Sequence, residues 1–187
     1  YLLTLGMPAV FALCIAELVL VMVLSARLGK MSIAGARGLF FAYAILNGVT
    51  FSAVFFAYDV QILLSVFALT ALYFGALAAY GWLTKRDLSG LGTILGFSVL
   101  FLLVFWVLSM FLPLGAFERI ICFIGLAVFM GCTAYDTQRI KHLHAEYGED
   151  YEMSKKASIF AALQLYLDFI NIFLYILRLL GRRSSSN

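Results

Sequence analysis

Six runs of apolar residues, each long enough to cross a lipid bilayer, constrain this sequence more than any other feature. They cover residues 8–26, 36–58, 60–83, 92–112, 118–138 and 157–180. A membrane-spanning α-helix needs about 20 such residues. Only 12% of the residues are charged, which is about half the fraction found in soluble domains. The runs therefore predict an all-α, polytopic transmembrane helical bundle with six spans.

The same pattern predicts one integral membrane domain over residues 1–187. Within it we expect a polar loop at 142–156 and a polar tail at 181–187, where charged and small polar residues replace the apolar ones. The first apolar run lacks the basic segment that precedes a secretory signal. The net charge of +3 relates to orientation in the bilayer, and no nucleic-acid partner is expected. No phosphate-binding loop or catalytic motif occurs, so an enzyme is not expected.

Basic residues are distributed unequally between alternate connections, which predicts the orientation. The first, third and fifth connections hold most of them: Arg27, Lys30, Arg37, Lys85, Arg86, Arg139, Lys141, Lys155 and Lys156. The positive-inside rule places these connections in the cytoplasm. If the last run crosses the membrane, as we expect, the opposite side holds Arg119, Arg178, Arg182 and Arg183, which is against the rule. The alternative is a re-entrant last segment.

Small residues recur at four-residue spacing in the third run, at Ala71, Gly75 and Ala79. Such spacing permits close approach between helices. We interpret it as a packing feature.

Three carboxylates, Glu17, Asp136 and Asp168, interrupt the apolar runs. A charged side chain at bilayer depth costs a few kcal/mol or more. Asp168 stands in "LQLYLDFIN" with Gln164 four residues before it and Asn171 three residues after it, so the three form one polar stripe on a helix. No basic residue lies within a helical turn of Asp168. Its partner is therefore expected on another helix.

The polar residues also have structural interpretations, which remain open from the sequence. Glu17 can be a neutral, hydrogen-bonded carboxyl, and Asp136 can be an interfacial residue paired with Arg139 or Arg86. Asn47, in the second run, can join the amides of the polar stripe as hydrogen-bonding contacts between helices.

Three segments, "TKRDLSGLG", "TAYDTQRIK" and "LQLYLDFINIFLYILRLLG", resemble the Bax inhibitor family of membrane proteins, also called the transmembrane Bax inhibitor motif family. The resemblance extends through nearly the whole chain, to a bacterial type of member. It implies a seven-helix fold with a central last helix, so a first helix is expected upstream of Tyr1. It also implies a calcium leak that responds to pH through two aspartates, in the bacterial inner (plasma) membrane.

The resemblance assigns roles to four residues. The two aspartates correspond to Asp136, in the "YD" motif, and Asp168, in the "LYLDFIN" motif. Glu17 matches an acidic residue of the family's second helix, a candidate carboxylate of the ion path. Arg27 is the nearest candidate for a basic residue that bonds the aspartates and acts as a latch. No cofactor is implied, apart from Ca²⁺ as the ion that is bound or transported.

The chemistry of two neighbouring carboxylates agrees with this role. In a site of low dielectric they cannot both ionise easily, so they titrate as a pair. When deprotonated they offer oxygen ligands to a hard cation such as Ca²⁺, and an arginine could close the path by bridging them. However, Asp136 is near the end of its run and Asp168 is deep in its own. They can meet only if the fifth helix extends past the membrane surface or the last helix enters from outside the hydrocarbon layer.

The sequence therefore favours a pH-sensitive calcium leak. The alternative is a regulator that transports nothing and binds other membrane proteins, such as a membrane protease or components of stress and cell-death signalling. An intramembrane aspartyl protease has the least support, because "AYDTQ" and "YLDFI" lack the glycine-containing flank expected of such enzymes.

Overall fold

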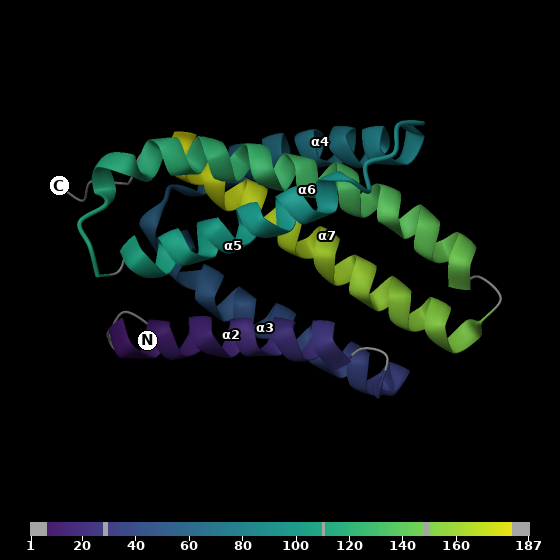
Figure 1. Cartoon of the computed structure of the whole chain (residues 1–187). Coiled ribbons are helices and arrows are strands. Elements are labelled where there is room, and N and C mark those ends of the chain that lie inside the picture. The colour runs from purple at the N-terminus through teal and green to yellow at the C-terminus, as the bar shows by residue number, and fades with distance from the viewer. Residues whose placement is uncertain (1–6, 28–29, 110, 148–149, 181–187) are drawn as a thin grey trace. The chain divides into compact units, whose positions relative to one another are not determined.

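The computed structural model of this chain describes residues 7–27, 30–109, 111–147 and 150–180. Within those residues the secondary structure is helical and contains no strand (Figure 1). The helices are α2 (Met7–Arg27), α3 (Ile33–Ala57), α4 (Val60–Leu83), α5 (Leu91–Ser109), the short 3-10 helix η2 (Gly115–Phe117), α6 (Glu118–Tyr147) and α7 (Tyr151–Leu180). The predicted all-α class is confirmed.

Five segments of the described residues are long and apolar enough to cross a membrane. They are Ile33–Ser52, Val60–Leu83, Leu91–Ser109, Gly115–Tyr147 and Tyr151–Leu180. In the last of them, which is α7, 33% of the most apolar stretch is buried inside the protein, against 6–22% in the other four. The chain is thus a multi-pass helical membrane protein in which α7 is the most enclosed of these spans.

The chain divides into two compact units, which are described separately below. The first unit comprises Tyr1–Val60, Leu143–Leu163 and Arg183–Asn187, and the second comprises Gln61–His142 and Gln164–Arg182. Helices α6 and α7 each contribute residues to both units.

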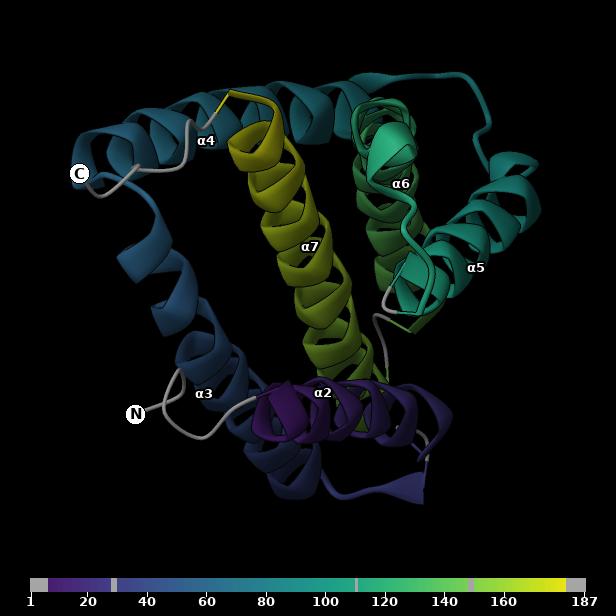
Figure 2. The same ribbon diagram turned by 90° about the vertical axis from the view of Figure 1, so that its left-hand side faces the viewer.

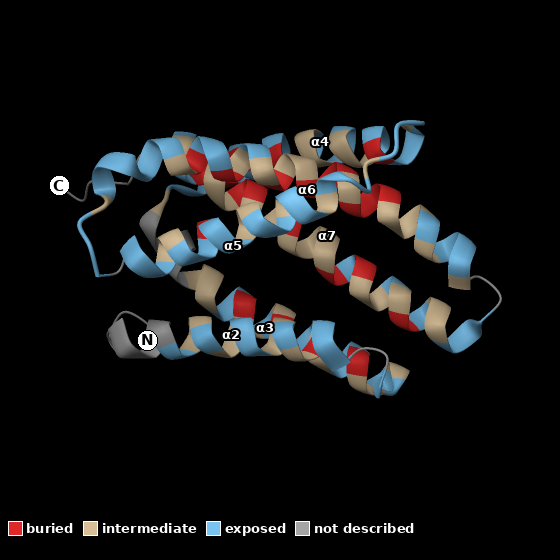
Figure 3. Ribbon diagram, viewed as in Figure 1, coloured by how far each residue is buried: buried red, intermediate tan, exposed pale blue. Residues whose placement is uncertain are grey.

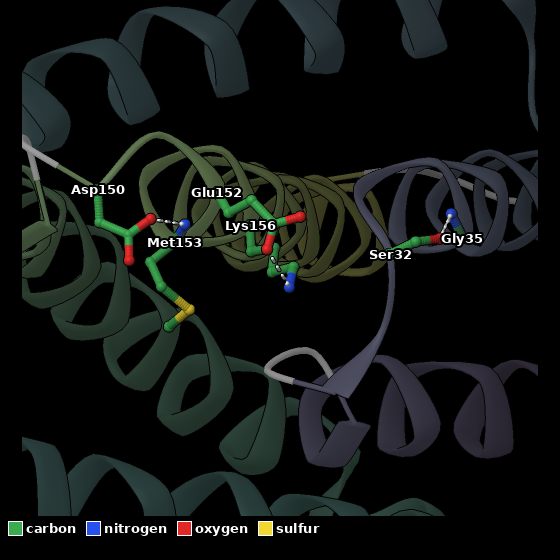
Figure 4. A network of polar contacts seen from close by, with 6 residues as sticks. All are labelled: Ser32, Gly35, Asp150, Glu152, Met153 and Lys156. Atoms are coloured by element: carbon green, nitrogen blue, oxygen red, sulfur yellow. Dashed lines mark hydrogen bonds and ion pairs between the residues drawn. The ribbon is translucent and has the colours of Figure 1, made fainter.

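In the first unit, side-chain hydrogen bonds fix the starts of two helices. The Ser32 hydroxyl caps α3 by accepting a hydrogen bond from the Gly35 amide at 3.1 Å. Asp150 does the same for α7, where its carboxylate accepts from the Met153 amide at 3.0 Å. These are the residue types that satisfy the free amides of a first turn. Figure 4 shows both caps, together with the ion pair between Lys156 and Glu152 at 3.6 Å.

In the second unit, α4 lies beside both α6 and the C-terminal half of α7 (Figure 2). The aromatic ring of Phe169 on α7 packs edge-on against Phe67 and Phe74 of α4, with ring centroids 5.6 and 5.5 Å apart. Buried positions concentrate on α6 and α7, whereas α5 has one buried residue, Leu102 (Figure 3). The core of this unit is therefore formed mainly by α4, α6 and α7.

The polar segment at 142–156 differs from the prediction of a loop. Helix α6 continues to Tyr147, and α7 begins at Tyr151. The segment is therefore largely helical, because polar residues such as Glu and Lys are good helix formers outside the hydrocarbon layer. The predicted polar tail, 181–187, lies outside the described residues, as do Arg182 and Arg183.

The lengths of α6 and α7 bear on whether Asp136 and Asp168 can lie at the same depth in the membrane. Each helix has 30 residues and is about 45 Å long, whereas the hydrocarbon layer is about 30 Å thick. Helix α6 extends about three turns beyond Asp136. The fifth helix is thus long enough to run past the membrane surface, as the first of the two conditions under which the aspartates can meet requires.

The small residues at Ala71, Gly75 and Ala79 do not mark the close helix contact. All three are exposed, and an added Cβ at Gly75 would meet nothing within 4 Å. The close approach occurs instead at Gly81, where an added Cβ would lie within 3.0 Å of the backbone of Ala134. The spacing of small residues indicated the right helix but the wrong face.

Candidate functional site

Asp168 lies in the enclosed half of α7. Its residue is 4% exposed, and Ile172 and Leu177 on the following turns are buried almost completely. The other members of the polar stripe, Gln164 and Asn171, are half-buried. The Asn171 amide donates a hydrogen bond to the main-chain oxygen of Leu167 at 2.8 Å. The stripe therefore faces the protein at Asp168, as the sequence predicted for a membrane-embedded carboxylate.

Asp136 lies on a polar face of α6. It is 8% exposed, and Thr133 and Thr137 on the same face are buried as well. The hydroxyl of Thr133 donates to the Phe129 oxygen at 2.9 Å, and that of Thr137 donates to the Thr133 oxygen at 2.7 Å. The helix itself thus satisfies the hydroxyl donors, while the hydroxyl oxygens can still accept a hydrogen bond or contact a cation.

The structure brings Asp136 and Asp168 together. Their carboxyl groups lie close enough to act on each other through their charges, and the Thr133 hydroxyl lies near Asp168. Among the described residues, the buried Oδ2 of Asp168 has no hydrogen-bond partner. Native proteins leave few buried polar atoms unpaired, and an exception often marks a functional group. We call Asp136 and Asp168 the aspartate pair.

A basic residue accompanies the pair on α6. Arg139, one turn after Asp136, is half-buried and acts on the Asp136 carboxyl through its charge. This agrees with the structural interpretation of Asp136 as a partner of Arg139. Asp136 also lies near Asp168, so its role in a pair of aspartates stays a prediction beside that interpretation.

Close packing between helices holds α6 against α4 and α7. At Gly81 the α4 backbone touches α6 next to Thr133, near Asp136. At Gly125, about three turns away, the α6 backbone touches the ring of Tyr175 on α7. Added side-chain atoms at either glycine would overlap these neighbours. Phe129 and Tyr175 also pack with ring centroids 6.0 Å apart. The absence of side chains at two positions thus lets α4 and α7 approach α6 closely.

Gln138, on the turn after the pair, clamps the connection between α4 and α5. Its amide nitrogen donates to the Arg86 oxygen, and its amide oxygen accepts from the Leu88 nitrogen, both at 2.7 Å. Lys141 adds a hydrogen bond to the Trp82 oxygen at 2.6 Å. The clamp holds the connection against α6 on the side where that helix leaves the apolar region.

Glu17 occupies a different environment in the first unit. Thr50 donates to its Oε1 at 2.6 Å, and Asn47 donates to its Oε2 at 3.3 Å. We call these three residues the Glu17 cluster. Its bonds join α2 to α3, which favours the structural interpretation of Glu17 and Asn47. Arg27, the predicted latch, ends α2 in the same unit with an exposed side chain, and its role stays a prediction.

The sequence interpretation missed the threonines and Gln138. A signal was present, because Thr133, Asp136 and Thr137 stand at i, i+3 and i+4 and share one helix face. Gln138 and Thr50 had no such signal, since their partners are distant in the sequence.

The donor set near the pair is small for a resident metal ion. Among the described residues, no group of three or more His, Cys, Asp or Glu side chains could hold a metal. Calcium prefers six to eight oxygen ligands, and two carboxylates supply at most four. The two aspartates alone therefore do not complete the shell of a calcium ion.

Comparisons with known proteins identify relatives along the whole chain. A family model described as "Inhibitor of apoptosis-promoting Bax1" matches residues 1–185. The chain is 42% identical to the "Inner membrane protein YbhL" of Escherichia coli K12, over 91% of this chain and 74% of that protein. It is 34% identical to the "Uncharacterized membrane protein SpyM3_0260" of Streptococcus pyogenes serotype M3, over 92% of this chain and 74% of that protein.

Proposed function

The chain belongs to the Bax inhibitor family, and from this premise we propose that it is a pH-sensitive cation leak, with calcium as its ion, gated at Asp136 and Asp168. The observation that carries the proposal is the contact between two buried carboxyls, one of which has an unpartnered oxygen. Such an oxygen is free to take up a proton or to contact a cation. The relative named as an inner membrane protein supports the bacterial inner membrane as its location.

The proposed gate works through the charge of the pair. At acid pH the carboxyls share a proton and hold each other by a hydrogen bond. Nearer neutral pH both ionise. An arginine that bridges the two carboxylates could then close the path, and protonation of the pair weakens this latch. The ionised carboxylates also offer oxygen ligands to a calcium ion.

Arg27 remains the proposed latch, from the family pattern alone. If it bonds the pair, Arg27→Ala removes a cation that favours the ionised carboxyls, and the pH dependence of flux should shift upward. An unchanged profile would exclude Arg27 and leave the gate to the pair and its neighbour Arg139.

Calcium flux into liposomes tests the gate directly. The chain and its variants Asp136→Asn, Asp168→Asn and the double variant are reconstituted with a calcium dye inside, and flux is followed from about pH 5 to pH 8, where such a pair could titrate. Each single variant should lose the pH dependence, and the double variant should add little, because the residues act as a unit. The matched control is Asp87→Asn, the same change at an exposed carboxylate outside the spans.

The results separate two functions. If both single variants leak calcium with the wild-type pH profile, the pair is structural and the gate is refuted. If the wild-type chain passes no calcium at any pH, the regulator that binds other membrane proteins becomes the leading function.

A further inference from the structure

A pocket of about 810 Å³ lies in the second unit where α6 begins and α7 ends. Two arginines line it, Arg119 on α6 and Arg178 on α7. Its other walls are mainly apolar and include Phe123, Leu126 and Ile176. The volume is within the range of about 300–1,000 Å³ that is typical of small-molecule sites. We call it the arginine pocket.

The lining of the arginine pocket changes from basic to apolar with depth in the membrane. Arg119 is in the first turn of α6 and Arg178 is in the last turn of α7, so both cations mark the same end of an antiparallel pair of helices. Leu126, two turns further along α6, lies about 10 Å deeper. The pocket is thus basic at its rim and apolar toward the middle of the bilayer, as the headgroup and tails of a phospholipid require.

A second, smaller pocket extends this surface along α4. It has a volume of about 390 Å³ and is lined by Ile62, Val66 and four other residues. Leu69 and Leu180 line both pockets, so the two are adjacent. We call the smaller pocket the α4 groove.

Neither arginine is held in an ion pair in the part of the chain that the structure describes, although Glu118 precedes Arg119 and acts through its charge on Cys122. Both side chains are exposed, and within the described residues neither forms an ion pair with a carboxylate. Arg178 does contact the thiol of Cys122, which supplies no negative charge. An unpaired guanidinium next to hydrocarbon is a strong site for phosphate, which it binds in a bidentate manner.

The positive-inside rule does not explain the position of these two arginines. By the distribution of basic residues, this end of α6 and α7 faces outward, where the positive-inside rule disfavours arginine. Basic pockets between transmembrane helices bind anionic lipid headgroups on the cytoplasmic side of membranes. The same pairing of guanidinium and phosphate can operate at the outward end of α6 and α7.

We propose that the arginine pocket binds one anionic phospholipid, with its phosphate between Arg119 and Arg178 and its acyl chains along the apolar wall and the α4 groove. The site involves neither carboxyl of the aspartate pair and does not depend on the proposed calcium flux. Its ligand is a lipid of the outward-facing leaflet, which always surrounds the pocket.

Native mass spectrometry of the delipidated full chain in detergent tests the site, with dioleoyl phosphatidylglycerol as the anionic probe and dioleoyl phosphatidylcholine as the zwitterionic one. The wild-type chain should retain one phosphatidylglycerol in preference to phosphatidylcholine. Arg119→Gln and Arg178→Gln should each lower that affinity about fivefold, which corresponds to about 1 kcal/mol per arginine. Both residues are exposed, so the variants should fold, and circular dichroism verifies this.

Arg86→Gln is the matched control, because Arg86 is equally exposed and lies outside the arginine pocket. It should bind phosphatidylglycerol like the wild type. Equal binding by all variants would refute the site. If inorganic phosphate or soluble glycerol phosphate displaces the lipid at equal concentration, the pocket binds a free anion and the lipid assignment is wrong. Phe123→Ala removes an exposed part of the apolar wall. It should weaken the binding of phosphatidylglycerol and leave the binding of glycerol phosphate unchanged.

Discussion

The Glu17 cluster and the aspartate pair both contain carboxyl groups in apolar helices, but the two sites differ in the hydrogen-bond donors that they provide. Glu17 is half-buried and accepts hydrogen bonds from a threonine and an asparagine on the adjacent helix. Asp168 is 4% exposed and faces another carboxyl, with one oxygen unpartnered among the described residues. A carboxylate with fixed donors stabilises a hairpin. One without them is available for protons and cations.

This contrast shows what to look for in a membrane helix. An acidic residue in an apolar run is not by itself a sign of transport, because neighbouring hydroxyls and amides can satisfy it at little cost. The informative observation is which donors remain, and that depends on the helix packed against it.

The largest effect is expected from opening the packing that encloses the aspartate pair. Gly81→Ala would place a Cβ within 3.0 Å of the Ala134 backbone, so α4 and α6 must separate. Overpacking of this kind costs about 1–3 kcal/mol, and a lower midpoint of thermal unfolding in detergent measures it.

Gly75→Ala on the same helix is the control, since an added Cβ there meets nothing within 4 Å. It should be neutral or stabilise by up to about 1 kcal/mol, because alanine favours the helix. Equal losses in the two variants would mean that α4 does not approach α6 closely at Gly81.

The next effect tests the sign of each carboxylate's contribution to stability. Glu17→Gln should lower the free energy of unfolding by about 1 kcal/mol, because Thr50 and Asn47 donate to two different oxygens of Glu17 and the glutamine amide keeps only one acceptor. Asp168→Asn should raise it by a similar amount near neutral pH, because an amide can donate to Asp136 where two charges repelled each other. Denaturant titration of both variants provides the measurement. A loss of stability in Asp168→Asn as large as that in Glu17→Gln would remove the contrast.

Two cysteines report on access to the two sites. Cys14 is half-buried one turn before Glu17, and Cys132 is buried one turn before Asp136. In single-cysteine variants a small thiol reagent should label Cys132 at least about tenfold more slowly than Cys14. This ratio corresponds to an opening free energy of about 1.4 kcal/mol or more. Adding Gly81→Ala should accelerate labelling of Cys132 and leave Cys14 unchanged. Equal rates in the parent variants would show that the aspartate pair is not shielded.

The smallest effect is expected at Asp87, an exposed carboxylate in the connection clamped by Gln138. Its carboxylate accepts a hydrogen bond from the Ser89 amide at 2.9 Å, which holds the pKa of Asp87 below its usual value. The stabilisation is therefore complete above about pH 4 and is lost as the pH falls through the lowered pKa. Asp87→Asn should change stability slightly above pH 4 and leave its pH dependence between 5 and 8 unaltered. A change in that range would assign part of the pH response to this connection.

Much of the architecture could be predicted from the sequence because transfer into a bilayer depends on local composition. Every 20-residue window either can or cannot cross hydrocarbon, whatever the rest of the chain does, so the runs agree with the observed helices to within a few residues over most of their bounds. The same reasoning does not apply to polar stretches. Hydropathy measures transfer into the bilayer and does not measure backbone conformation, so it did not indicate that the segment 142–156 is helical over most of its length.

The identity of Asp168 as an exceptional residue was also determined by the sequence alone. Its cost in hydrocarbon is a property of the residue and its neighbours along one helix. By contrast, the contact with Asp136 required two helices longer than the membrane, together with glycines on α4 and α6 that let neighbouring helices approach closely. Gly81 and Gly75 look equivalent in the sequence, and only the approach of α6 distinguishes them.

The donors around each carboxylate were decided by the tertiary structure. Thr50 reaches Glu17 across 33 residues, and Gln138 reaches Leu88 across 50. Hydrogen bonds act over about 3 Å, so such pairs exist only once packing has set the helices side by side. Composition therefore determined which residues enter the membrane, and packing determined which of their charges are satisfied there.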